Sequence, residues 1–162
     1  MYKRQDDERI PDSFEIARKM SLSYSFGIAN LTSAHPNSVV LEVKGKSGRT
    51  LEVQACSLGG GRIMINRLDG LDVNCSCEIP TLIVHNLDQP GHVAEVTSML
   101  AHKSVNIANM SLYRDKRGGS AVMVVEMDQP LPKESLEWLE HLEGIVKVTY
   151  INVTEGEEDD VL

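Results

Sequence analysis

Polar groups that could hold a small molecule gather in one short turn, from Asn86 to Gly91. Asn86 and Asp88 carry side-chain oxygens that accept hydrogen bonds from an amino or hydroxyl group. The turn leads directly into a predicted helix, and the first backbone N–H groups of a helix form a ready site for a carboxylate. The pattern therefore predicts a binding site for a ligand that carries both kinds of group. The structural alternative is that Asp88 caps the helix and Gly91 relieves a tight packing point.

Two histidines flank this turn. His85 ends the preceding strand and His92 lies on the first turn of the helix, so each either lines a ligand pocket or is a partly exposed residue at the end of an element. The five histidines show no H-E-x-x-H spacing. No Ser-His-Asp order and no carboxylate pair stands out either. We therefore expect no catalytic residue on this chain.

The three cysteines give little sign of a metal site. Cys75 and Cys77 form a C-x-C pair and Cys56 is distant, whereas zinc and iron–sulfur sites usually take four ligands. Alternation along a strand would also point the thiols of Cys75 and Cys77 to opposite faces. We expect these thiols to be structural and no metal to bind here.

A run of three glycines, Gly59–Gly61, is the last candidate for chemistry. The run lacks the Gly-Lys-Ser/Thr ending of a phosphate-binding loop, and a strand is predicted after it instead of a helix. The favoured interpretation is a bend that only glycine permits, where the backbone of another chain approaches closely.

The elements around the Asn86–Gly91 turn are regular. Apolar residues at helical spacing predict a helix over 91–103, and Pro132 fits the first turn of a second helix that Gly144 ends. Apolar and β-branched runs predict four strands, over 81–85, 105–113, 121–127 and 145–153. The order is βαββαβ, which predicts two helices on one face of a four-stranded antiparallel sheet.

Residues 1–77 read differently. Asp12 and Ser13 are predicted to cap a short helix, and the alternation over 24–29 indicates a strand. Further strands are predicted over 39–43, 50–56 and 63–65, separated by turns rich in Gly and Asn. Short strands spaced in this way favour an antiparallel meander, so the chain as a whole is predicted to be α+β.

Composition excludes several classes of partner. The chain has 162 residues, of which 41% are hydrophobic, and a formal net charge of −8, which disfavours nucleic acid and anionic membranes. No apolar run approaches the roughly 20 residues of a membrane-spanning helix. Three cysteines suit a reducing cytoplasm. Residues 154–162 are expected to form an acidic disordered tail, and the chain is expected to begin inside a domain whose first part is missing.

The second half resembles an ACT domain, the small amino-acid-sensing module of metabolic enzymes. The resemblance depends on Leu82–Gly91, on Val105-Asn106-Ile107 at the start of the next strand, and on the strand after Gly144. It implies an ACT domain over 78–153 that forms homodimers and binds a small amino acid. The ligand contacts that it implies are Asn86, Leu87, Asp88, Gly91, His92 and Val93, with Asn106 and Ile107 contributed by a neighbouring ACT domain.

The first half is similar to the β subunit of iron–sulfur L-serine dehydratases. The matching segments are 7–13, His35-Pro36-Asn37-Ser38 and Ala55–Ile63. The resemblance implies a partial allosteric-substrate-binding-like α/β domain over 1–77. It also implies that catalysis, with its [4Fe–4S] cluster, belongs to a separate α subunit. In that family the domain normally starts further upstream, with a Ser-Ser-Ser-His-Thr segment that this sequence lacks.

These resemblances define three hypotheses. The first is a regulatory and structural subunit of an enzyme that converts L-serine to pyruvate and ammonia, which binds L-serine or a similar amino acid. The second is a stand-alone amino-acid sensor, or a regulatory tail such as that of phosphoglycerate dehydrogenases. The third is a self-sufficient enzyme built on the Cys and His residues.

Overall fold

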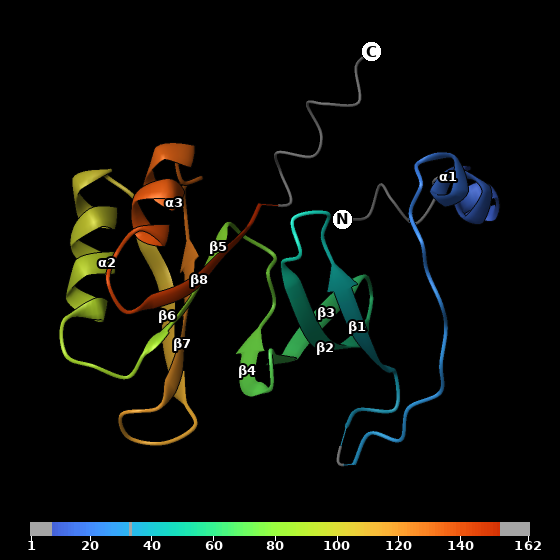
Figure 1. Ribbon diagram of the computed structural model, residues 1–162, viewed down its shortest axis with the longest axis horizontal. Coiled ribbons are helices and arrows are strands. Elements are labelled where there is room, and N and C mark those ends of the chain that lie inside the picture. The colour runs from blue at the N-terminus through green and yellow to red at the C-terminus, as the bar shows by residue number, and fades with distance from the viewer. Residues whose placement is uncertain (1–7, 33, 153–162) are drawn as a thin grey trace.

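Two four-stranded antiparallel sheets make up the molecule. The computed structural model describes residues 8–32 and 34–152. Helices α2 (His92–His102) and α3 (Lys133–Glu140) cover one face of the C-terminal sheet, and the N-terminal sheet lies on its other side (Figure 1). This arrangement confirms the α+β class. The predicted acidic tail lies outside the described residues.

The C-terminal half follows the predicted βαββαβ order and has the ferredoxin-like ACT arrangement. Its strands are β5 (Thr81–Leu87), β6 (Ile107–Arg114), β7 (Ser120–Met127) and β8 (Ile145–Ile151), in the spatial order β6-β7-β5-β8. Strands β6 and β8 are therefore the edges. Helix α3 ends at Glu140, so Gly144 lies in the α3–β8 turn and does not itself end the helix.

The N-terminal half is a meander in the order β1-β2-β3-β4. Its strands are β1 (Ser38–Lys44), β2 (Thr50–Gly59), β3 (Arg62–Leu68) and β4 (Leu71–Cys75). Gly59, Gly60 and Gly61 all have positive φ, between 61° and 84°, so they form the β2–β3 turn in a conformation that disfavours other residues. Strand β3 follows directly, as predicted.

The region before β1 corrects two predictions. A short 3-10 helix (Ile10–Asp12) precedes α1 (Ser13–Lys19), and Asp12 makes no side-chain hydrogen bond that caps α1. The predicted strand over 24–29 is wrong, because the backbone there pairs with no other strand of the described chain. Its aromatic residues pack locally instead. The Tyr24 ring stacks on the Phe14 ring of α1, with centroids 5.2 Å apart, and meets the Phe26 ring edge-on, with centroids 5.8 Å apart.

Alternation along β5 builds two cores, one on each face of the C-terminal sheet. Leu82 and Val84 face the two helices, in a cluster with Val96, Leu100 and Leu139. Ile83 faces the other way, towards the meander. The second cluster combines residues of both sheets, namely Ile65, Leu68, Val73, Cys75 and Cys77 with Ile83, Val122 and Val124. The meander therefore buries the sheet face that the helices leave open.

The thiols of Cys75 and Cys77 lie in this second core and correct another prediction. Their sulfur atoms are 3.0 Å apart and face each other, not opposite sides of a strand. Strand β4 ends at Cys75, and Cys77 has a φ of +53°, so the alternation stops between them.

No helix in the described part of the chain is long and apolar enough to cross a membrane.

Candidate functional site

The predicted turn lies between the end of β5 and the start of α2, as expected. Gly91 occupies the N-cap position with a φ of +113°, and no side chain caps the helix. The first intrahelical bond recorded there runs from the Glu95 amide to the Gly91 carbonyl. The preceding amides of His92, Val93 and Ala94 have no acceptor four residues back within the helix, so they can receive a carboxylate.

Gly91 is required by its backbone conformation, not by crowding. An added Cβ would meet no atom within 4 Å, so the predicted packing role is wrong. The φ of +113° is one that L-residues rarely adopt, and this explains the glycine.

Asp88 neither caps α2 nor stands alone. Its carboxylate accepts hydrogen bonds from the Gly118 amide at 2.9 Å and from the Arg114 guanidinium at 3.1 Å. The Asp88 amide also donates to the Gly119 carbonyl. The Gly118 hydrogen bond and the Arg114 charge hold the pKa of Asp88 below its usual range. Asp88 therefore fastens the β6–β7 hairpin loop to the turn, and a ligand ammonium would compete with Arg114 for it.

Asn86 is buried at the base of the turn, on the helix-facing side of β5. Its side-chain amide donates to the Leu87 carbonyl at 2.6 Å. Its Oδ1 atom is buried and has no hydrogen-bond partner among the described residues. Because an unmatched buried acceptor is costly, this atom is a natural place for a donor group of a ligand.

His92 joins the turn to the α3–β8 connection. The residue is 7% exposed, and Nδ1 lies 3.1 Å from a Glu95 carboxylate oxygen. The ring lies against Gly144, where an added Cβ would come within 2.5 Å of Nε2. The Gly144 carbonyl in turn accepts the Leu87 amide. His92 and Gly144 thus fix the start of α2 against the start of β8.

The remaining predicted contacts occupy two places. Leu87 and Val93 are 42% and 41% exposed at the rim of the turn. Asn106 and Ile107 lie at the other end of the sheet. Ile107 pairs with Met127, the last residue of β7, whereas the turn follows Leu87, which pairs with Ser120, the first residue of β7. One chain therefore does not bring Asn106 to the turn. Asn106 binds Asp128 and Gln129 instead.

His85 does not line the turn. It alternates with Asn86 and faces the meander, where Nε2 lies 3.6 Å from an Asp69 carboxylate oxygen, too far for a hydrogen bond. Burial lowers the pKa of His85, in opposition to the Asp69 charge. The period of two along β5 was sufficient to predict this orientation.

Lys147 on β8 joins the two sheets beside His85. Its ammonium donates to the Thr50 carbonyl at 2.8 Å and to the Asp69 carboxylate at 2.5 Å. Burial works to raise the pKa of Asp69, but the hydrogen bonds from Lys147 and the Glu52 amide hold it below its ordinary value. Arg49 adds hydrogen bonds to the Val148 carbonyl and to Thr149. Sequence reasoning missed the pairs made by Lys147 and Arg49 because their members are 78 to 100 residues apart.

The Arg114 and Gly144 contacts were also missed. Arg114 begins the charged run Arg114-Asp115-Lys116-Arg117, which is typical of a solvated hairpin loop, and nothing local in the sequence links it to Asp88. Gly144 carried a signal, since a glycine before a strand indicates a tight turn.

Among the described residues, no cluster of three or more His, Cys, Asp or Glu side chains could hold a metal ion.

Comparisons with known proteins identify a domain family and several relatives. The ACT domain family model matches residues 80–143. The chain is 32% identical over 145 residues to a protein of Bacillus subtilis named probable L-serine dehydratase, beta chain. It is 30% identical over 149 residues to the L-serine dehydratase, beta chain, of Peptoniphilus asaccharolyticus. These alignments cover 90% and 91% of this chain, and 66% and 67% of the two relatives, so the chain spans about two thirds of their length.

A different enzyme matches a shorter part of the chain. D-3-phosphoglycerate dehydrogenase of Methanocaldococcus jannaschii is 31% identical over 90 residues, which is 56% of this chain and 17% of that protein.

Proposed function

The chain belongs to the family of L-serine dehydratase β chains, and from this premise we propose that it is a regulatory and structural subunit. Its partner is a catalytic α subunit that carries a [4Fe–4S] cluster and converts L-serine to pyruvate and ammonia. The complex acts in the cytoplasm. The ACT domain over 78–153 binds L-serine or a similar amino acid, and residues 1–77 form a partial allosteric-substrate-binding-like domain.

The observation that carries the sensing role is that unpaired hydrogen-bond donors and an unpaired acceptor lie together at the start of α2. Uncapped helix amides suit a carboxylate, and the unmatched Oδ1 of Asn86 suits an ammonium or hydroxyl group. A free amino acid presents both groups.

The buried state of Asn86 supports regulation. Its Oδ1 atom is covered in this structure, so the ligand must bind a state in which the turn has opened. A ligand that binds one state better shifts the population towards it. An opened turn disturbs the Leu87–Gly144 hydrogen bond, and with it β8, whose Lys147 holds the meander.

A homodimer through β6 explains how Asn106 reaches the ligand. Strand β6 is an edge, and antiparallel pairing with a second β6 is one way to cover it. If the two β6 strands pair symmetrically about their midpoints, Ile107 of one copy lies opposite Arg114 of the other. Arg114 contacts Asp88 in the turn, so the second copy's Asn106 and Ile107 come to the ligand site.

Co-purification tests the assembly. The full chain, co-expressed with an iron–sulfur α subunit and purified without oxygen, is expected to elute with it as a brown complex that deaminates L-serine. The matched control is the α subunit expressed alone. Separate elution of the two chains, together with full activity of the α subunit alone, would contradict the subunit role.

The second candidate is a stand-alone amino-acid sensor. The match to a phosphoglycerate dehydrogenase over about half of the chain favours it. It predicts a stable homodimer that binds an amino acid in the absence of any α subunit and does not associate with one when both are present.

A further inference from the structure

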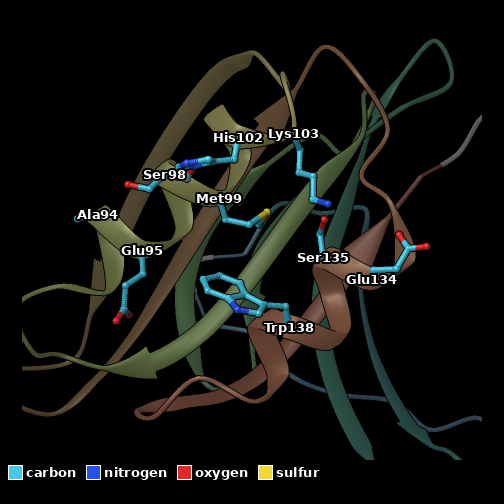
Figure 2. A pocket seen from close by; sticks show the side chains of 9 residues that line it. All are labelled: Ala94, Glu95, Ser98, Met99, His102, Lys103, Glu134, Ser135 and Trp138. Atoms are coloured by element: carbon cyan, nitrogen blue, oxygen red, sulfur yellow. The ribbon is translucent and has the colours of Figure 1, made fainter.

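A hollow between α2 and α3 lies on the outer surface of the C-terminal half. It has a volume of about 630 Å³, within the range of small-molecule sites. Met99 and the indole of Trp138 form its apolar floor, and Lys103 and Ser135 lie at one end (Figure 2). Trp138 is 46% exposed, which is unusual for so large an apolar ring.

Ser135 gives the second and independent sign of a ligand. The residue is 2% exposed, and its hydroxyl has no hydrogen-bond partner among the described residues. A helical serine usually satisfies its hydroxyl on the preceding turn or in water, so an unmatched buried hydroxyl facing a hollow is costly unless a ligand completes it.

Lys103 supplies a positive charge beside Ser135. Figure 2 shows its ammonium pointing towards the Ser135 hydroxyl, whereas the carboxylates of Glu95 and Glu134 point away from this gap. No carboxylate in the described part of the chain lies within salt-bridge distance of Lys103. Ser135 is also in the first turn of α3, whose N-cap Pro132 offers no side-chain cap, so the helix dipole adds positive potential.

We propose that this hollow binds an organic monocarboxylate with a flat apolar body. The carboxylate takes hydrogen bonds from Lys103 and Ser135, and the apolar body lies on Trp138 and Met99. The two acidic residues at the rim, Glu95 and Glu134, disfavour ligands with more than one negative charge. Lys103 and Ser135, which hold the carboxylate, take no part in the proposed amino-acid site, so this proposal does not depend on it.

Trp138 provides a direct readout because it is the single tryptophan of the sequence. In the test, 3-phenylpropionate is titrated into the full chain and tryptophan emission is followed. We expect a saturable change in emission. The uncharged analogue 3-phenylpropanamide is expected to bind at least about tenfold more weakly, because it lacks the charge that meets Lys103.

Variants locate the binding. Lys103→Gln and Ser135→Ala are each expected to weaken 3-phenylpropionate about tenfold, and Lys46→Gln, in the exposed β1–β2 turn, is expected to leave it unchanged. The unfolding midpoint of Ser135→Ala is expected to stay level or rise, since it removes an unmatched hydroxyl, so lost folding does not mimic lost binding. The proposal is overturned by a titration that does not saturate or by equal affinity for the acid and the amide. It is also overturned if the emission changes with protein concentration and not with ligand concentration, because that would show a second copy of the chain on this face.

Discussion

The Gly144–His92 contact is a tightly constrained residue pair near the candidate site. Gly144 has a φ of +80°, and an added Cβ would lie 2.5 Å from His92 Nε2 and 2.6 Å from Cε1. Gly144→Ala therefore adds a steric clash to backbone strain, and we expect a loss of about 2–3 kcal/mol in the free energy of unfolding. Gly70→Ala is the matched control: its φ is +83° with no atom within 4 Å, so only the strain of about 1 kcal/mol is expected.

Denaturant unfolding of these two variants checks this prediction. Adding His92→Ala to Gly144→Ala should recover part of the loss, because it removes the ring that the methyl group meets. Equal losses for Gly144→Ala and Gly70→Ala would mean that the ring does not lie against Gly144.

At the scale of elements, β8 carries the polar link between the two sheets, and His85 makes that link sensitive to pH. The pKa of His85 is lowered from its ordinary value of 6.5 by burial. The unfolded chain thus binds a proton more readily than the folded chain. The contribution of His85 to the free energy of unfolding is therefore fully present above pH 6.5. It is lost as the pH falls below this value, with a slope of at most about 1.4 kcal/mol per pH unit.

Unfolding free energies measured between pH 7.5 and about pH 5 test this expectation. His85→Gln should flatten the decline in this range, whereas His141→Gln, at an exposed position, should leave it unchanged. The account of His85 fails if both variants show the same decline as the original chain.

Local pattern predicted the elements far better than the contacts between them. Apolar spacing in 91–103 and β-branched runs such as 145–153 indicated the βαββαβ half because each signal is contained within one element. The alternation over 24–29 misled, because a strand also needs a neighbour to pair with. For the same reason the Asp88–Arg114 and Lys147–Asp69 pairs could not be predicted from the sequence, because each joins segments that only the folded structure brings together.

At the scale of the whole molecule, the two sheets share a core and should stabilise each other. Ile83 faces the meander and Val84 faces the helices, and their side chains are 1% and 0% exposed. We expect Ile83→Ala to cost about 2–4 kcal/mol, similar to or greater than Val84→Ala, because both leave cavities in a packed interior. If the meander did not pack on the sheet in solution, Ile83 would face water and its substitution would cost little.

Binding of L-serine at the start of α2 is the claim on which the regulatory role depends. Calorimetric titration of L-serine into the full chain is expected to show saturable binding. Asn86→Ala and Asn106→Ala should each weaken it about tenfold, the first within one chain and the second across a homodimer, whereas Asn37→Ala should not. Absence of saturable heat, or unchanged affinity in both the Asn86 and Asn106 variants, would contradict an amino-acid site at this turn.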